Sequence, residues 1–285
     1  MGAEKELPMK IVRHSVACRC LGAAALLALT TSCNGTPANA ATEEEAPASL
    51  FQGHAKPAIL LVHGAFADAL GWQQVTALLQ QRGYTVDAVE NPLTSLATDV
   101  ATTQRAIAAL AAKGPLVVVG HSYGGMVISG AAVGVPQVKA LVYINAFAPD
   151  PGQSVSALLA TAPATKLGAA LLPPDSAGFL FVDPAQFRAA FSADVSVAES
   201  NVAAVSQKPI FAGAFGETLP AVAWKTIPSW YLVGKQDQAI NPDSERAMAK
   251  HIGAHTVEID SSHVSFISHP HAVVELIEEA VHGAH

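Results

Sequence analysis

The sequence is poor in cysteine, in charged residues and in aromatic residues for a chain of 285 residues. Its three cysteines, Cys18, Cys20 and Cys33, all precede Ala40, which excludes a disulfide framework or a thiolate metal site in the rest of the chain. Only 14% of the residues are charged, and 23 acidic against 16 basic side chains give a net charge of −7, which argues against nucleic-acid binding. The hydrophobic share of 51% is too high for a mainly disordered chain.

The sequence also lacks a hydrophobic run long enough to span a membrane. The apolar run from Leu21 to Leu29 has about half of the ~20 residues that a membrane-spanning helix needs. Lys10, Arg13 and Arg19 precede this run and Ala38-Asn39-Ala40 follows it, which is the layout of a secretory signal peptide. We therefore expect residues 1–40 to be a signal peptide and the protein to be exported, either to the periplasm or out of the cell.

The end of this signal allows a second interpretation. Thr30-Thr31-Ser32-Cys33 resembles the lipobox of lipoproteins and would place a lipid anchor at Cys33, although Thr30 stands where Leu is usual. Cleavage after Ala40 would instead remove four basic and two acidic residues and leave a net charge of −9. Residues 41–56 are then expected to form a flexible leader before a soluble acidic domain, with no nucleic-acid partner.

From residue 57 onward, short apolar runs alternate with segments of helical periodicity. The predicted strands are 58–62, 84–89, 116–119, 139–146, 229–234 and 255–260, and helices are predicted at 72–82, 97–113 and 124–133. This alternation predicts an α/β fold whose mostly parallel sheet of about six strands is flanked by helices and joined by right-handed crossovers. The core is predicted over residues 57–148 and 227–285.

The alternation is interrupted between residues 149 and 226, a segment with eight prolines and six phenylalanines. A structureless loop of this length is uncommon in a compact domain, so we predict a compact insertion of several helices. Packing of the insertion explains each phenylalanine taken alone, but together they are expected to wall an apolar pocket. Phe179, with Phe66 and Phe147 from the core, is a candidate substrate-binding residue.

The motif that carries chemistry follows the predicted strand 116–119. Residues 120–124 read Gly-His-Ser-Tyr-Gly, a G-x-S-x-G motif between a buried strand and a helix. The two glycines let strand and helix approach, and the tight turn lifts the Ser122 hydroxyl above the carboxyl edge of the sheet as a nucleophile. The helix N-terminus offers free N–H groups, so the Tyr123 N–H is expected to bind an oxyanion.

A second oxyanion donor is expected from the turn after the first strand, where residues 62–66 read Val-His-Gly-Ala-Phe. The Ala65 N–H is the preferred donor and the Phe66 N–H is the alternative. Two preorganised donors stabilise the charge that develops on an attacked carbonyl oxygen. His63 in the same turn is expected to have a structural role, because another histidine fits the role of base better.

A serine nucleophile needs a base, and the base needs an orienting acid; after this type of turn they follow in the order acid, then histidine. Asp237 lies in the loop after the predicted strand 229–234, and His263 lies in the loop after the strand 255–260. Both loops belong to the sheet edge that carries Ser122. The sequence therefore predicts a catalytic triad of Ser122, Asp237 and His263.

Other residues compete for two of these roles. The competing acids are Asp243 and Asp260, and the competing bases are His121, His269 and His271. The first acid is expected to cap the helix that begins near Pro242, and the second is too near His263 in sequence to orient it. One of the histidines directly precedes the nucleophile and should point away from it, and the other two open the last helix. No histidine pair has the spacing of an H-E-x-x-H site, so a metal site is not expected. The chemistry of a serine, a histidine and an acid needs no cofactor, so none is expected.

Together these motifs resemble the α/β-hydrolase superfamily over about Pro57 to His282, and within it the compact esterase branch of plant methylesterases, hydroxynitrile lyases and bacterial relatives. The matching stretches are VHGAF at 62–66, GHSYGG at 120–125, AFAPD at 146–150, KQDQAI at 235–240 and SSHVSF at 261–266. The resemblance implies the same triad, an oxyanion hole at Ala65 and Tyr123, and a cap over residues 149–226.

Within this branch, two residues favour an esterase. Hydroxynitrile lyases have Lys after the triad Asp and Thr beside the oxyanion hole, where this chain has Gln238 and Gly64. We therefore expect a serine carboxylic-ester hydrolase that forms an acyl-enzyme on small to medium, apolar or aromatic esters. The alternatives are a lyase or acyltransferase on the same scaffold, and an exported protein that binds a ligand without turnover.

Overall fold

The computed structural model describes residues 56–283, so the predicted signal peptide, the lipid anchor at Cys33 and all but the last residue of the predicted leader lie outside the described residues. A six-stranded sheet with the order β2-β1-β3-β4-β7-β8 forms the centre, and every neighbouring pair is parallel. Its strands are β1 (Ala58–Val62), β2 (Val86–Val89), β3 (Leu116–His121), β4 (Val138–Ile144), β7 (Ser229–Gly234) and β8 (His255–Ile259). The predicted α/β fold with a mostly parallel sheet is confirmed.

The inner and edge strands of the sheet differ in sequence because they are buried to different extents. All six residues of β3 are buried, as are all six of β7, and both strands are largely apolar. A parallel strand covered by helices on both faces needs this continuous apolar character. The edge strands β2 and β8 carry the polar residues Asp87 and Glu258 at exposed positions.

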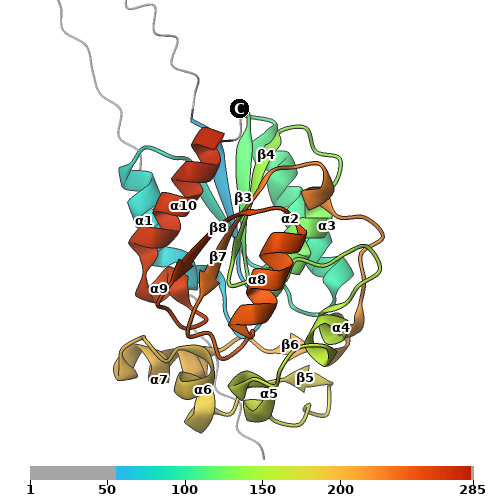
Figure 1. Cartoon of the computed structure of the whole chain (residues 1–285), viewed down its shortest axis with the longest axis vertical. Coiled ribbons are helices and arrows are strands. Elements are labelled where there is room, and N and C mark those ends of the chain that lie inside the picture. Colours follow the sequence, from blue (N-terminus) through green and yellow to red (C-terminus); the bar gives the residue numbers. More distant parts are fainter. Residues whose placement is uncertain (1–55, 284–285) are drawn as a thin grey trace, which may run out of the picture. The chain divides into compact units, whose positions relative to one another are not determined.

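Helices cover both faces of the sheet (Figure 1). One face carries α1 (Gln73–Gln81) and α10 (Pro270–Gly283), and the other carries α2 (Leu96–Ala111), α3 (Tyr123–Ala131) and α8 (Pro242–His251). The short η1 (Ala69–Trp72) precedes α1, and the short α9 (Ser265–Ser268) precedes α10. None of the helices within residues 56–283 has the length and hydropathy of a membrane span.

The cap of α8 differs from the prediction. The side chain of Asn241 accepts a hydrogen bond from the Asp243 N–H at 2.9 Å, and Pro242 occupies the first turn. The expectation that Asp243 caps this helix was therefore wrong, because the cap is the residue directly before the proline. Asp243 instead forms an ion pair with Arg246 at 2.7 Å.

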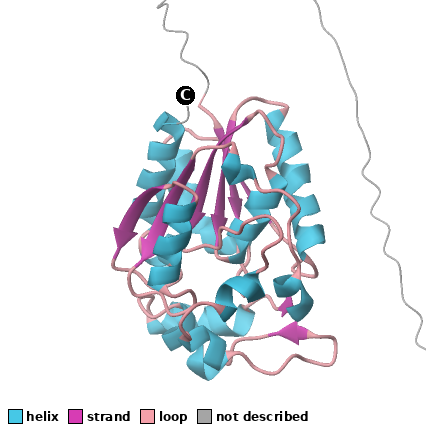
Figure 2. Ribbon diagram, turned by 45° about the vertical axis from the view of Figure 1, so that its right-hand side comes forward, coloured by secondary structure: helices cyan, strands magenta, loops and turns pink. Residues whose placement is uncertain are grey.

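Between β4 and β7 the chain forms short elements beyond the carboxyl ends of the strands. They are α4 (Val155–Ala160), α5 (Lys166–Ala170), β5 (Phe179–Leu180), α6 (Pro184–Phe191), α7 (Val197–Ser206), β6 (Ile210–Phe211), η2 (Ala212–Gly216) and η3 (Ala223–Lys225). The strands β5 and β6 pair in an antiparallel ribbon. In Figure 2 the arrowheads of the large sheet point toward this part of the molecule. The carboxyl edge of the sheet and the 149–226 segment thus face each other.

Candidate active site

Ser122 occupies a strained turn between β3 and α3. Its φ of 53° and ψ of −124° lie in a region that residues with a side chain rarely adopt. Three backbone hydrogen bonds hold it there: the Ser122 N–H donates to Ile144 O at 3.2 Å, and Ser122 O accepts from Gly125 at 3.0 Å and from Phe147 at 3.1 Å. The turn presents the serine as a fixed group at the sheet edge.

Two glycines beside Ser122 are required by close backbone approach. A Cβ on Gly120 would lie 2.7 Å from Gly124 O, and a Cβ on Gly124 would lie 2.5 Å from Val62 O. Real Cβ atoms essentially never make contacts this short. This explains both glycines of the motif in the way that the sequence predicts.

The structure distinguishes between the two candidates for the second oxyanion donor. The Phe66 N–H donates to Lys208 O at 3.1 Å and is occupied. The Ala65 N–H has no acceptor among residues 56–283, and Ala65 lines the same cavity as Ser122 and Tyr123. Tyr123 is the first residue of α3, so its N–H has no acceptor within the helix. The geometry therefore favours Ala65 and Tyr123 over Phe66.

His63 has both ring nitrogens in use. Its Nδ1 bonds to Gly64 O at 2.8 Å, and its Nε2 accepts the Asn91 N–H at 3.0 Å, which makes Nδ1 the protonated nitrogen. Burial lowers the pKa of His63 and keeps it neutral. His63 holds the turn that carries Ala65, in agreement with the structural role expected for it.

Asp237 and His263 meet at the same edge. The loops after β7 and β8 bring His263 Nδ1 to 2.6 Å from Asp237 Oδ2, and both side chains are buried. Asp237 Oδ1 accepts two further N–H groups, from Ala239 at 2.6 Å and from Ile240 at 3.0 Å. Three donors thus fix the Asp237 carboxylate, which in turn orients the His263 imidazole through one of these contacts.

The other nitrogen of His263 is free. Nε2 is buried and has no hydrogen-bond partner within residues 56–283, Ser122 included. The His263 ring packs against Phe191 with ring centres 4.9 Å apart, and Phe191 lines the cavity that also contains Ser122. In sites without substrate, the hydrogen bond between nucleophile and base is often long and tightens only when substrate binds.

The competing residues have other partners. Asp260 is exposed and pairs with Lys235 at 2.9 Å. His121 Nε2 lies 3.0 Å from His263 O, to which it donates, so this nitrogen is not available as a base. His269 Nδ1 lies 2.9 Å from Ser268 Oγ on a half-exposed side chain. His271 is exposed and does not line the cavity.

Two buried acids near the site, Asp99 and Glu245, were not predicted from the sequence. Asp99 on α2 accepts the Tyr123 hydroxyl at 2.9 Å and the Leu93 N–H at 2.8 Å, and burial raises its pKa to about 6. Glu245 on α8 accepts the Gly234 N–H at 3.0 Å beside the Asp237 loop. The available signal was spacing, because each acid falls on the buried side of its helix at helical intervals from apolar residues.

A cavity of about 420 Å³ opens onto Ser122. Its walls come from the sheet edge and from the 149–226 segment, and the described residues that form them include no Asp, Glu, His, Lys or Arg. The apolar side chains that line it are Phe66, Phe147, Val155, Leu159, Pro163, Leu167, Leu171, Phe191, Phe215 and Ile240, with several alanines. The cavity therefore suits a neutral, apolar group.

One predicted pocket residue is misplaced. Phe66 and Phe147 line the cavity, but Phe179 does not, because it packs against Phe211 across the β5–β6 ribbon with ring centres 5.8 Å apart. Phe191 and Phe215 take the place expected of Phe179. The segment contains six phenylalanines, but their positions in the sequence do not show which of them face the cavity.

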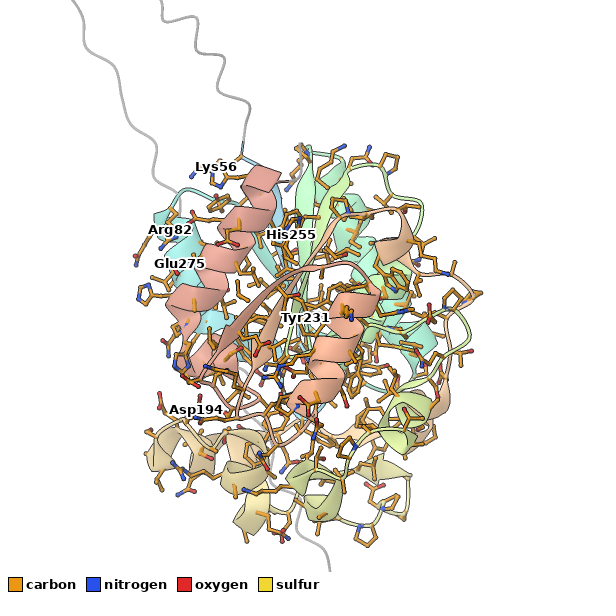
Figure 3. All side chains as sticks on the ribbon, viewed as in Figure 1. Lys56, Arg82, Asp194, Tyr231, His255 and Glu275 are labelled. Atoms are coloured by element: carbon orange, nitrogen blue, oxygen red, sulfur yellow. The ribbon has the colours of Figure 1, made fainter. Side chains whose placement is uncertain are left out.

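Asp194 connects the 149–226 segment to the loop of His263. Its carboxylate accepts the Ser262 N–H at 2.9 Å and also bonds the Ser262 hydroxyl. Figure 3 shows Asp194 where the short helices meet the core. The segment that walls the cavity is thus tied to the loop that carries His263.

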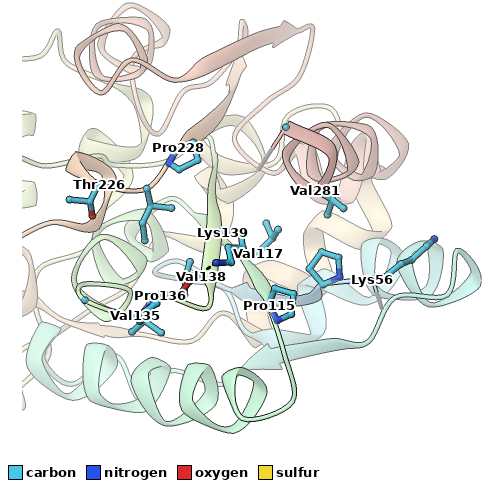
Figure 4. Close-up of a pocket in the computed structure, with 14 residues that line it drawn as sticks. Lys56, Pro115, Val117, Val135, Pro136, Val138, Lys139, Thr226, Pro228 and Val281 are labelled. Atoms are coloured by element: carbon cyan, nitrogen blue, oxygen red, sulfur yellow. Dashed lines mark hydrogen bonds between the residues drawn. The ribbon is translucent and has the colours of Figure 1, made fainter. Parts of the chain in front are cut away.

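A second hollow, of about 1050 Å³, lies at the opposite edge of the sheet (Figure 4). Val117, Val138 and Pro228, at or just before the amino ends of β3, β4 and β7, contribute to its lining. Within residues 56–283, the lining contains no Ser, His, Asp or Glu. Among residues 56–283, this hollow therefore lacks the serine, histidine and aspartate that meet at the other edge.

Asp237, Glu245 and His263 also form a group of potential metal ligands, with one atom of each within 4.8 Å of the others. The carboxylate oxygens of Asp237 and Glu245, however, already accept protein donors: Asp237 takes the imidazole and two amides, and Glu245 takes the Gly234 N–H. We interpret this group as a hydrogen-bonded acid–base set.

The model of the Alpha/beta hydrolase family matches residues 59–276. The chain belongs to the α/β-hydrolase family. Alpha/beta hydrolase nvfD of Aspergillus novofumigatus is 28% identical over 244 residues, which cover 79% of this chain and 96% of the relative. A carbendazim hydrolyzing esterase of a Nocardioides species is 46% identical over 67 residues, covering 23% of this chain and 24% of that protein. Family and relatives support a hydrolase-type function.

Solved structures agree with the fold. Polyneuridine aldehyde esterase superimposes with a TM-score of 0.68 at 20% identity, covering 79% of this chain and 99% of that one. An extracellular α/β-hydrolase from a Paenibacillus species superimposes with a TM-score of 0.66 at 23% identity, covering 79% and 98%. At these identities, the likeness shows the α/β-hydrolase fold alone.

Proposed function

We propose that this α/β hydrolase is a serine carboxylic-ester hydrolase. The observation that carries the proposal is the buried Nε2 of His263, which lacks a partner although the opposite nitrogen is bound to Asp237. A buried polar atom without a partner is costly, and a base awaiting a serine hydroxyl and a substrate explains it. The names of the carbendazim hydrolyzing esterase and of polyneuridine aldehyde esterase support ester hydrolysis.

In the proposed mechanism, His263 Nε2 takes the proton of the Ser122 hydroxyl as Oγ attacks the ester carbonyl. The N–H groups of Ala65 and Tyr123 stabilise the oxyanion, and Asp237 stabilises the imidazolium. The imidazolium then gives its proton to the departing alcohol, which leaves an acyl group on Ser122. Water, deprotonated by His263, attacks the acyl carbonyl, and the same proton returns to Ser122 Oγ as the acid is released.

The substrate class follows from the cavity walls. A volume of about 420 Å³ without ionisable side chains other than Tyr123 suits a short or medium acyl chain or an aromatic ring. A carboxylate on the substrate would lose its hydration there without finding a cation. We propose that neutral apolar esters are the substrates and that residues 149–226 act as the cap over residues 57–148 and 227–285.

Ester turnover by wild type and two serine variants tests the proposal. With p-nitrophenyl butyrate, Ser122→Ala should lose at least about 10³-fold in kcat while its melting temperature stays within a few degrees of wild type. Ser206→Ala, an exposed serine of α7, is the matched control and should keep wild-type turnover. Turnover by Ser122→Ala at the wild-type rate would refute the nucleophile. Ligand binding without turnover by wild type would favour the binding protein.

We propose in addition that the protein is exported and cleaved after Ala40. The basic residues, apolar run and small residues of 1–40 support this proposal. Mass spectrometry of the protein from its host should find Ala41 as the first residue. A lipid-modified Cys33 at the N-terminus would identify a lipoprotein instead.

A further inference from the structure

Glu245 is a buried carboxyl group that the mechanism above does not use. Its Oε2 accepts the Gly234 N–H at 3.0 Å, and its Oε1 faces the Asn145 amide at 3.5 Å. One oxygen of Glu245 lies within 4.8 Å of an oxygen of Asp237 and a ring nitrogen of His263. No lysine or arginine in the described part of the chain forms an ion pair with Glu245.

Ionising both of two buried carboxyl groups at this separation is unfavourable without a cation for each. Asp237 has the partners of an ionised group, namely the His263 Nδ1–H and two backbone N–H groups. Glu245 has one backbone donor and one long amide contact. The proton therefore belongs on Glu245, and burial together with the Asp237 charge raises the pKa of Glu245 well above its ordinary value.

We propose that Glu245 is a positioning residue that stays protonated and donates a hydrogen bond to Asp237. This donor would hold the Asp237 carboxylate toward His263 and moderate its negative charge without adding a second charge. Loss of the donor would leave a more basic Asp237, which pairs more strongly with the imidazolium. The kinetic part of this proposal rests on the proposed function, whereas the protonation of Glu245 does not.

Few other groups near Glu245 can change charge. Asp237 and His263 face it from the loops after β7 and β8, and Tyr231 faces it from β7. The Tyr231 hydroxyl donates to Ala146 O, and burial raises the pKa of this tyrosine well above its ordinary value, so it stays neutral. From β4, Asn145 contributes an uncharged amide.

The first experiment measures protonation through stability. An acid whose pKa is higher in the folded than in the unfolded state costs stability as pH rises, because only the unfolded state releases its proton. The Tm of Glu245→Gln minus that of wild type should therefore be larger by several degrees at pH 8 than at pH 4. Glu275→Gln, at an exposed glutamate of α10, is the control and should show the same difference at both pH values. A difference for Glu245→Gln that is constant or shrinks with pH would overturn the protonation.

The second experiment separates positioning from packing. Glu245→Gln keeps a donor for Asp237, so its kcat should stay within about threefold of wild type with an unchanged acid limb of the kcat/KM profile. Glu245→Leu removes the donor, so kcat should fall about tenfold at nearly constant KM, and the acid limb should move to higher pH.

Two kinetic outcomes would overturn the positioning role. Either Glu245→Leu keeps the wild-type rate and acid limb, or Glu245→Gln loses as much as Glu245→Leu does. If wild type turns over no ester, the proposed function fails, and the stability experiment still decides the protonation. If Glu245→Leu does not fold, the pH dependence of Tm for Glu245→Gln and its acid limb remain as the tests.

Discussion

The loops at the carboxyl edge of the sheet and the 149–226 segment face the same cavity but are built differently. In the edge loops, the side chains of His63, Asp237 and His263 are buried, and within residues 56–283 their nitrogen and oxygen atoms, except His263 Nε2, have protein hydrogen-bond partners. In the 149–226 segment, short helices contribute apolar side chains to the cavity wall. Other side chains of the segment are less well packed than those of the loops: Val205 on α7 is 80% exposed. The edge loops fix atoms for chemistry, whereas the segment supplies shape. Changes in the loops should therefore affect kcat, and changes in the segment should affect substrate preference.

The largest expected effect is the loss of the base. His263→Ala should lower kcat for p-nitrophenyl butyrate by about 10⁴-fold, because it removes the imidazole that we propose takes the Ser122 proton. His269→Ala removes a half-exposed ring outside the cavity and should keep wild-type kcat. The reverse result, with His269→Ala inactive and His263→Ala active, would show that His269 and not His263 is the base.

The next effect concerns the oxyanion turn. A Cβ at Gly64 would lie 2.6 Å from Ser122 Cβ and 2.8 Å from His121 O, so Gly64→Ala must displace the turn or the nucleophile. A displacement of about 1 Å costs about 100-fold in kcat. Gly216→Ala, in the segment, meets open space and is the matched control. Equal activity of the two variants would show that the edge is not rigid.

The third effect is a pH dependence of stability from Asp99. Its pKa of about 6 lies above its ordinary value of 3.8, so raising the pH from 4 to 7 destabilises wild type, because the unfolded state releases this proton first. Relative to Asp99→Asn, wild type should lose roughly 2 kcal/mol of unfolding free energy over this range. Urea unfolding of wild type and of Asp99→Asn at pH 4 and pH 7 measures this difference in unfolding free energy. A relative stability that does not change with pH would mean that Asp99 is ionised throughout.

The smallest expected effect lies in the segment. Leu159 lines the cavity and is 38% exposed, so Leu159→Ala should raise KM for a butyrate ester by about threefold and leave kcat nearly unchanged. Leu172→Ala is the matched control, because Leu172 is 41% exposed and lies outside the cavity lining. A large fall of kcat in Leu159→Ala would contradict the proposal that the edge loops determine kcat and the 149–226 segment determines substrate preference.

The same division explains what the sequence predicts and what it does not. The apolar run of β3 and the Gly120–Gly124 turn that follows it are local patterns, and their combination leads to the sheet and to Ser122. Asp237 and His263 follow from the position of loops at strand ends. Phe179 was misplaced because the direction of a side chain in such short elements depends on tertiary packing, and the periodicity of the local sequence does not determine it. Asp243 was misplaced because Asn241, two residues earlier and directly before Pro242, takes the cap position.

Covalent labelling tests the central claim most directly. A fluorophosphonate probe, followed by peptide mass spectrometry, should modify Ser122 in wild type, and labelling should be lost in Ser122→Ala and slowed at least about 100-fold in His263→Ala. Labelling that stays as fast in His263→Ala as in wild type, or that falls on a different serine, would contradict an activated Ser122 at this sheet edge.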